Sequence, residues 1–207
     1  AHDTMLPRWP PYIVARPTED AIANWLRRRL PAKTAYAITR WKNVLLQQYF
    51  YRIARKHPDK AKERIVDMVR QELGPDYDVG THFTPRYNPW DQRLCLVPDA
   101  DLFAAIREGK ADVVTDTIER FTETGIRLSS SRELPAGLVV TATGLELQLA
   151  SGIPVTVDGR AVNWSERMTY KGMMYSDVPN LAISFGYTNA SWTLKADLTA
   201  GYVTRLL

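Results

Sequence analysis

The stretch YNPWDQRLC, residues 87–95, places one arginine among aromatic rings, a proline and a carboxylate. A guanidinium stays charged at any working pH and offers several hydrogen-bond donors, so Arg93 could stabilise negative charge that develops on a reacting group. The alternative is structural, because Arg93 could instead form an ion pair with Asp91 or Asp101 at a junction between loop and helix. The residues alone leave both roles open.

A second group of polar residues lies near the C-terminal end of the chain. The apolar run NLAISFG predicts a buried strand, and SWTLKADLTAGYVTRLL predicts a helix capped at Asn189 or Ser191. The first amides of a helix attract anions, so a strand, a short polar loop and a helix start form a geometry suited to phosphate. Helix capping alone is the other role that these two side chains could have.

The run GLVVTATG, residues 137–144, predicts an apolar strand that ends in a glycine. Gly144 has no Cβ atom, so it allows another backbone or a cofactor to approach closely. An ordinary strand followed by a glycine turn would give the same pattern.

Helical spacing predicts three helices that precede these motifs, over Ala21–Leu30, Thr34–Lys56 and Asp59–Leu73. The first is expected to be capped by Thr18 or Asp20, and the third ends before a glycine. These helices form an all-helical insertion in the predicted fold.

The segments around the helices follow other patterns. Residues 1–16 are expected to form the end of a strand and a loop, and PDYDVGTHFTPRYNPWDQR is expected to be a loop. Asp99 is the predicted cap of a short helix in DADLFAAIREGK. After it, ADVVTD and IERFTETGIRL predict strands with a turn at Gly125, TETGIRLSSSRELPAG resembles a β-meander, and VTVDGRAV predicts a hairpin with Asp158 and Gly159 at its tip.

The charge of the chain is unevenly distributed. The net charge is +4, but residues 1–70 hold 15 Lys/Arg against 6 Asp/Glu, whereas residues 71–207 hold 12 against 17. The basic, aromatic-rich helical region could bind nucleic acid or an anionic membrane surface, although no nucleic-acid motif accompanies it. The alternative is a solvated helix with one side packed on a core, which would comprise Trp41, Val44, Leu45, Gln48 and Tyr49.

Several classes of site and location are not expected. Cys95 is the only cysteine, which excludes an intramolecular disulfide and a cysteine metal site, and the three histidines are too scattered for a metal cluster. No run of 18 apolar residues and no secretory signal pattern is present, so a cytoplasmic location is expected. The chain lacks a start methionine, and we expect it to be a fragment.

Several motifs, taken in order along nearly the whole chain, carry a family resemblance: TMLPRWPPYIV, YNPWDQRLCLVPDADLF, VVTDTIERFTETGIRL, LVVTATGLELQL and MTYKGMMYSDVPNLAISFGYTNASWTLKADL. Together they resemble flavin-containing monooxygenases of the Baeyer–Villiger group, and most of all their ethionamide-activating branch. The resemblance implies an enzyme that uses NADPH to reduce FAD and forms a C4a-peroxyflavin with dioxygen. One oxygen atom would then be inserted into a ketone, or added to the sulfur of a thioether or thiocarbonyl.

The resemblance also implies a fold class and a domain organisation. The fold would be α/β, with two interleaved dinucleotide-binding (Rossmann-like) domains, partial here, and an all-helical insertion. Residues 1–16 would be a remnant of the NADPH-binding domain, 17–90 the helical insertion and loop, 91–143 the remainder of the NADPH-binding domain, and 144–207 the C-terminal part of the FAD-binding domain. The chain contains no G-x-G-x-x-G, so this piece alone is expected to hold neither cofactor well.

The family's functional positions map onto particular residues here. Arg93 matches the active-site arginine, which stabilises the flavin-bound oxygen anion. Arg8 matches the arginine that pairs with the 2′-phosphate of NADPH, although Pro7 and Trp9 replace the usual neighbours. Gln92 stands where related enzymes often have a lysine; the resemblance implies a contact with the nicotinamide ribose, and the alternative is a side chain that lies in solvent.

The remaining candidate cofactor contacts come from two segments near the C-terminal end. Thr143 and Gly144 would lie where the chain crosses between the two cofactor domains. The flavin-side contacts would be Thr188, Asn189, Ser191 and Trp192.

The small-molecule partners implied are a ketone or sulfur compound and dioxygen. Nucleic acid is not expected, and weak association with a membrane surface stays open. Two other functions are carried forward from the residues: a truncated, non-catalytic remnant, and a basic helical module that binds membrane or nucleic acid.

Overall fold

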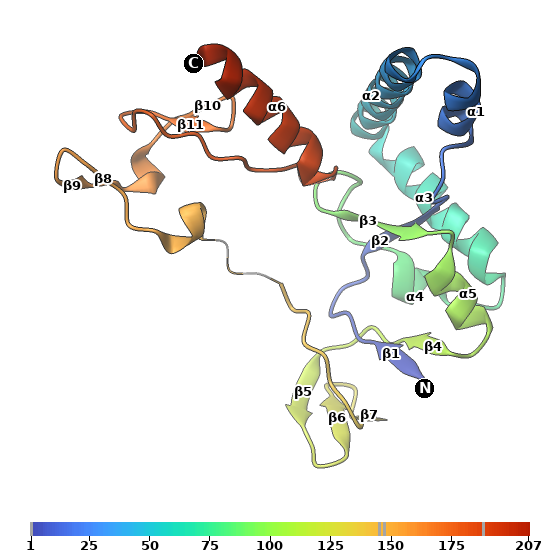
Figure 1. Ribbon diagram of the computed structural model, residues 1–207. Coiled ribbons are helices and arrows are strands. Elements are labelled where there is room, and N and C mark those ends of the chain that lie inside the picture. The colour runs from blue at the N-terminus through green and yellow to red at the C-terminus, as the bar shows by residue number, and fades with distance from the viewer. Residues whose placement is uncertain (1, 145, 147, 188) are drawn as a thin grey trace. The chain divides into compact units, whose positions relative to one another are not determined.

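A computed structural model of the chain describes residues 2–144, 146, 148–187 and 189–207. The chain divides into two compact units, Ala1–Leu138 and Val139–Leu207. Helices, parallel strand pairs and antiparallel hairpins occur together, so the predicted mixed α/β class is confirmed at that level. Figure 1 shows the elements along the chain.

Three helices of the first unit lie where they were predicted: α1 (Ala21–Arg29), α2 (Ala32–Lys56) and α3 (Pro58–Leu73). Local signals explain their ends. The Asp20 carboxylate accepts a hydrogen bond from the amide of Ala23 at 3.0 Å and caps α1. Gly74, with φ of 87°, ends α3 in the left-handed region that a glycine adopts easily.

Two short helices correct the sequence-based predictions. The expected loop after α3 contains α4 (Val79–Phe83), because the Asp78 carboxylate accepts from the amide of Thr81 and two apolar side chains one turn apart are buried. The predicted cap of α5 (Asp101–Arg107) is wrong. Asp99 instead binds the amide and hydroxyl of Thr18, and Ala100 occupies the N-cap position with φ of 59°.

Two parallel strand pairs lie in the first unit. β1 (Asp3–Met5) pairs with β4 (Ala111–Val113), and β2 (Tyr12–Arg16) pairs with β3 (Leu94–Pro98) in a register that sets Ile13 against Cys95. The prediction that residues 1–16 hold only a strand end and a loop is wrong, because two prolines precede β2 but do not interrupt it.

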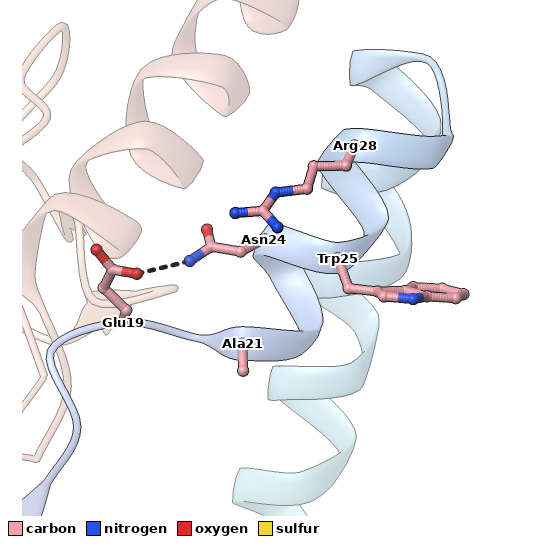
Figure 2. A pocket seen from close by; sticks show the side chains of 5 residues that line it. All are labelled: Glu19, Ala21, Asn24, Trp25 and Arg28. Atoms are coloured by element: carbon pink, nitrogen blue, oxygen red, sulfur yellow. Dashed lines mark hydrogen bonds between the residues drawn. The ribbon is translucent and has the colours of Figure 1, made fainter.

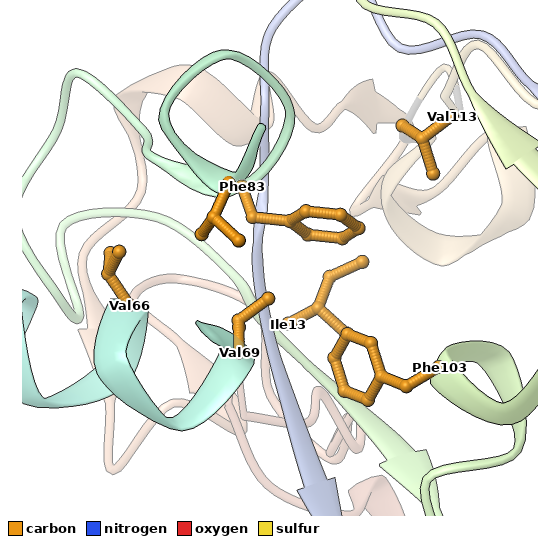
Figure 3. Packing of buried hydrophobic residues seen from close by; sticks show 7 residues of the cluster. Ile13, Val66, Val69, Phe83, Phe103 and Val113 are labelled. Atoms are coloured by element: carbon orange, nitrogen blue, oxygen red, sulfur yellow. The ribbon is translucent and has the colours of Figure 1, made fainter. Parts of the chain in front are cut away.

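A hydrophobic core joins these strands to the helices. Its buried members are Ile13, Val66, Val69, Val79, Phe83, Phe103 and Val113, and Figure 3 shows how they converge. Phe83 and Phe103 lie with ring centroids 5.9 Å apart. Each strand pair and each of α3, α4 and α5 therefore contributes at least one side chain, which fixes the loop between α4 and β3 at both ends.

The helix α2 departs from the expectation that its Trp41 side faces a core. The aromatic and aliphatic side chains of that face, Trp41, Leu45 and Tyr49, are exposed, and the buried residues of α2 are Ala35 and Ala54. The small alanines allow α1 and α3 to approach α2 at its two ends. The large side chains remain in solvent.

Three strands pair antiparallel in order: β5 (Ile118–Phe121), β6 (Gly125–Leu128) and β7 (Glu133–Pro135). The predicted meander TETGIRLSSSRELPAG holds β6 and β7, whereas the single strand expected over IERFTETGIRL divides into β5 and β6. Val114, Ile126, Leu128 and Leu134 form a second, smaller core beneath it. Gly125 is required by close packing: a Cβ atom there would lie 2.0 Å from the carbonyl oxygen of Leu134.

The second unit holds short elements and one long helix. The 3₁₀ segments η1 (Leu149–Gly152) and η2 (Trp164–Glu166) flank the hairpin β8 (Thr156–Val157) and β9 (Arg160–Ala161). That hairpin was predicted, and its turn residues Asp158 and Gly159 have φ of 50° and 78°. A second hairpin, β10 (Thr169–Tyr170) and β11 (Met174–Tyr175), precedes α6 (Trp192–Leu206).

Two predicted strands are not strands. Residues 137–144 and the NLAISFG segment have no strand assignment, and Leu138 and Val140 are 83% and 81% exposed. A strand needs a neighbour for its amides and carbonyls, and neither segment has a partner strand within the part of the chain that the structure describes. Within that same part, no helix combines the length and apolar character needed to cross a bilayer.

Candidate functional site

The loop between α4 and β3, residues 84–93, carries Gln92 and Arg93. Pro85 and Pro89 are fully buried in it. The buried hydroxyl of Tyr12 donates a hydrogen bond to the carbonyl of Tyr87 at 2.7 Å, and the two rings meet edge to face at 5.2 Å. Because Tyr12 is removed from water, its pKa is raised to about 12. The loop is therefore fixed against the start of β2.

The same loop is fastened to the helices. Arg55 donates to Asp91 at 2.5 Å, and the Tyr51 ring meets Trp90 at 6.2 Å. Trp90 has φ of 69°, a left-handed conformation that costs a bulky residue roughly 1–2 kcal/mol. Neighbouring contacts must hold this conformation in place, so the backbone ahead of Arg93 is constrained rather than free to reorient.

Arg93 is exposed and directly precedes β3, at the amino end of that strand. The hydroxyl of Tyr87 lies 3.4 Å from the carbonyl oxygen of Arg93. The structural alternatives for its guanidinium are not formed: Asp91 binds Arg55, and the Asp101 carboxylate accepts from the amide of Leu102. Its charged group is thus accessible to a ligand while its backbone is held. Gln92 lies beside it, also exposed.

Arg8 lies just beyond the carboxyl end of β1. Hydrogen bonds between β1 and β4 continue past both strands, from the amide of Val114 to Met5 and from the amide of Asp116 to Pro7. Arg8 therefore lies at the carboxyl edge of this parallel strand pair. Its side chain is exposed.

A cation–π contact joins the neighbourhood of Arg8 to the loop of Arg93. The guanidinium of Arg86 lies 4.5 Å from the ring centroid of Trp9. The contact joins the residue after Arg8 to the start of the loop that carries Gln92 and Arg93. Arg86 was not predicted as a site residue, and no local pattern marks it, because its partner lies in a distant part of the sequence.

The second unit contains the other predicted cofactor contacts. Thr143 and Gly144 are exposed; Gly144 has φ of 119°, and the space where its Cβ atom would lie is open. Such a glycine can accommodate a close backbone contact. Thr188 lies outside the described residues.

The start of α6 differs in part from the prediction. Ser191 occupies the N-cap position but makes no side-chain capping bond; its hydroxyl pairs with that of Thr193 at 2.7 Å. The first amides of α6 are left without a capping side chain from Ser191. Asn189 lies half-buried two residues earlier.

Trp192, the first residue of α6, turns back onto the preceding segment. Its ring lies 5.0 Å from that of Phe185, and a Cβ atom on Gly186 would lie 2.0 Å from the indole. Only glycine fits beneath the ring. This packing holds the segment before α6 close to the start of the helix.

A hollow of about 280 Å³ lies beside the carboxyl end of β4 and was not predicted from the sequence. Its lining residues are Asp76, Tyr77, Asp78, His82, Asp112, Val113, Val114 and Arg132. His82 Nδ1 lies 3.0 Å from the hydroxyl of Thr115. Three carboxylates and one guanidinium make this hollow a poor site for phosphate.

A second hollow, of about 360 Å³, lies on α1 and is lined by Glu19, Ala21, Asn24, Trp25 and Arg28. Figure 2 shows Asn24 donating to Glu19, at 2.8 Å, and Trp25 pointing away from that pair. Both hollows involve residues that sequence patterns alone did not single out for chemistry.

Comparison with known proteins gives matches over the entire chain. It is 57% identical over 206 residues to "FAD-containing monooxygenase EthA" of Mycobacterium tuberculosis, covering 100% of this chain and 42% of that protein. EthA of Mycolicibacterium smegmatis is 52% identical over 207 residues, again 42% of its length. "Probable FAD-binding monooxygenase AlmA" of Acinetobacter baylyi is 48% identical over 206 residues, 41% of its length.

The chain therefore spans less than half the length of these curated relatives. No family model and no solved structure matched it.

Proposed function

Because this chain is homologous along its full length to FAD-containing monooxygenases, we propose that it is part of an FAD- and NADPH-dependent monooxygenase. The proposed substrates are ketones, which would undergo Baeyer–Villiger oxidation, and thioethers or thiocarbonyls, which would be oxidised at sulfur. The proposed architecture is the interleaved pair of Rossmann-like domains. The identity of 57% over the whole chain carries this proposal.

The residues present are suited to contribute to cofactor sites. FAD, when bound and reduced by NADPH, would supply the activation of dioxygen. The first amides of α6, which Ser191 does not cap, offer donors to an anionic or carbonyl group of such a cofactor. The open side of Gly144 allows a cofactor to approach the backbone. Thr143, Thr188, Asn189 and Trp192 complete the proposed flavin-side set.

Arg93 is the proposed catalytic residue. The Tyr12 hydrogen bond, the Arg55–Asp91 ion pair and the buried prolines hold the backbone around it. A preorganised donor loses little freedom when negative charge develops beside it, and such a donor typically contributes on the order of 3 kcal/mol to a barrier. Its role is to stabilise that charge and not to transfer a proton, since a guanidinium does not deprotonate.

Arg8 and Gln92 have proposed binding roles. Arg8 lies at the carboxyl end of β1, where its guanidinium would pair with the 2′-phosphate of NADPH and so select it over NADH. Gln92, beside Arg93, would contact the nicotinamide ribose. Both side chains are exposed and can reach a ligand without displacing the core.

The experiment uses the full-length protein that contains this chain. After purification, the flavin absorbance spectrum is recorded, and NADPH consumption is followed with a cyclic ketone and with an aryl methyl thioether. We expect bound FAD and an oxygenated product from at least one of the two. A full-length protein that binds no FAD, or that oxidises neither substrate class with NADPH, would refute the proposal. Product analysis separates insertion next to a carbonyl from oxidation at sulfur.

A further inference from the structure

The helix α2 carries a row of large, mostly exposed apolar side chains. Ile38, Trp41, Leu45 and Tyr49 follow one another at spacings of three and four residues, so they line one side of the helix. They are 43%, 64%, 60% and 59% exposed. A row of large apolar side chains in water is unfavourable unless a partner covers it. We refer to these four residues as the α2 stripe.

The neighbouring helix α1 adds to this surface. α1 and α2 lie side by side (Figure 1), with Ala23, Leu26 and Ala35 buried and Lys42 of α2 paired with Asp20 at the start of α1. Trp25 on α1 is exposed and stacks with Arg29 at 4.5 Å. The buried contacts make the two helices one rigid body.

All charged side chains of α1 and α2 are basic. From Ala21 to Lys56 the chain holds nine Lys/Arg residues and no Asp or Glu. Lys42 and Arg55 have carboxylate partners from outside that range, Asp20 and Asp91. The others are Arg27, Arg28, Arg29, Lys33, Arg40, Arg52 and Lys56; Arg29 stacks on Trp25, and Arg40 donates to the hydroxyl of Tyr36. This surface is complementary to an anionic partner.

We propose that α1 and α2 form a docking surface for an anionic lipid bilayer, with the α2 stripe and Trp25 entering the headgroup region. Tryptophan and tyrosine prefer that region because one part of the ring is apolar and another donates hydrogen bonds. Lysine and arginine around an apolar face are typical of helices that lie flat on membranes. This inference does not depend on the proposed monooxygenase activity.

The test measures co-sedimentation of the full-length protein with vesicles. One set of vesicles contains phosphatidylcholine alone, and the other contains phosphatidylcholine with phosphatidylglycerol. We expect binding to the anionic vesicles that weakens as salt is raised, and little binding to the neutral ones. Absence of binding to anionic vesicles at low salt overturns the proposal.

Two pairs of variants locate the surface. Trp41→Ser/Leu45→Ser should abolish most of the binding, whereas Phe121→Ser/Leu138→Ser, which removes equally exposed apolar groups from outside the helices, should leave it unchanged. Arg27→Gln/Arg28→Gln should weaken binding by about fivefold for each charge removed. Lys60→Gln/Arg64→Gln on α3 is the matched control for charge. The proposal is overturned if Trp41→Ser/Leu45→Ser binds the vesicles as well as Phe121→Ser/Leu138→Ser does. It is also overturned if Arg27→Gln/Arg28→Gln binds as well as Lys60→Gln/Arg64→Gln.

The same variants distinguish a protein partner from a lipid. If the α2 stripe is covered by a second copy, Trp41→Ser/Leu45→Ser will lower the mass of the particle in light scattering. If another part of the longer chain covers it, this variant will lower the melting temperature and the flavin content. Either result overturns lipid docking. Wild-type mass, melting temperature and flavin content, combined with lost vesicle binding, support it.

Discussion

The hydroxyl of Tyr12, at the start of β2, donates to the backbone carbonyl of Tyr87 at 2.7 Å, and the Tyr87 ring stands edge-on to that of Tyr12. Tyr12 is fully buried, whereas Tyr87 belongs to the loop that leads to Arg93. One side chain of the parallel strand pair thus sets the path of a loop that carries an exposed guanidinium. A constraint on a loop backbone is effective when it comes from an element that cannot move, and β2 is part of the core.

Tyr12→Phe should loosen this loop without opening the core, because the phenylalanine ring keeps the packing and loses only the hydroxyl. The expected loss of stability is about 1 kcal/mol, the usual net value of one hydrogen bond. Hydrogen exchange of the amides in residues 84–93 should rise, while exchange in α3 stays the same. Unchanged exchange in the loop would show that Tyr87 is held by other contacts.

The Tyr12 hydroxyl also predicts a pH dependence. Burial, the main cause, raises its pKa from 10.0 to about 12, and the nearby Tyr87 and Asp91 add to the effect. Between pH 10 and pH 12 Tyr12 keeps its proton in the native chain but has lost it in the unfolded chain, so the free energy of unfolding falls as the pH rises. The stability contributed by the buried, protonated Tyr12 is therefore complete below pH 10 and disappears by about pH 12. The pKa values of Tyr77, Tyr87 and Tyr202 are also raised, so the measurement is a difference: titration of the tyrosinate absorbance should show a component near pH 12 that is missing in Tyr12→Phe.

Arg93→Ala in the full-length protein should lower kcat by about 10²–10³, the typical loss when one preorganised donor is removed. FAD absorbance should not change, since the flavin-side contacts lie elsewhere. Arg93→Lys should recover part of the activity, because an ammonium keeps the charge but not the planar set of donors. Arg64→Ala on α3 is the control. Wild-type turnover by Arg93→Ala would exclude a catalytic role.

Arg8→Ala should raise the KM for NADPH by about tenfold or more, because a charge-assisted hydrogen bond contributes roughly 1.5–3 kcal/mol. The KM for NADH should not change, since NADH has no 2′-phosphate to lose contact with. The informative measurement is the ratio of the KM for NADPH to the KM for NADH. A parallel rise for both cofactors would mean that Arg8 supports the fold rather than the phosphate.

Gly125→Ala should damage the meander. The added methyl group would lie 2.0 Å from the Leu134 carbonyl oxygen, so β6 and β7 would have to separate, at a cost of about 1–3 kcal/mol. Gly137→Ala is the matched control, because no atom lies within 4 Å of its added methyl group. Melting temperature and hydrogen exchange over residues 118–135 report the difference. Equal behaviour of the two variants would contradict the close packing at Gly125.

The sequence predicted well those elements whose signals are local. Asp20, Pro58 and Gly74 mark helix ends within one turn of the residues they affect, and α1, α2 and α3 end close to where those signals place them. The meander and the hairpin at Gly159 depend on turns, which are also local. The one-turn helix α4 escaped prediction because a single turn has no periodicity to detect.

Elements that depend on distant partners were predicted poorly. β2 was missed although its residues favour strands, because its partner β3 lies beyond the whole helical region. The apolar runs at Leu138 and in NLAISFG were predicted as strands, but no neighbouring strand pairs with either in the described structure. An apolar run indicates only that a segment can be buried, and not that it pairs with another strand.

In the candidate site, too, the sequence pointed to individual residues but not to the contacts between distant segments. Arg93 was first selected for its residue type and surroundings, Arg8 through the family resemblance alone, and the roles of both stay predictions. The contacts that surround them, from Tyr12 to Tyr87 and from Arg86 to Trp9, join segments far apart in the sequence, so no local pattern announces them.

The register of β2 and β3 has a consequence for the order of folding. Ile13 and Cys95 face each other across a parallel pair whose connection includes α1, α2, α3 and α4. Closing so long a connection is slow, whereas the helices between can form early from nearby contacts. The strand pair should therefore be a late step, and the thiol of Cys95, half-buried in β3, should lose its reactivity toward alkylating reagents only then.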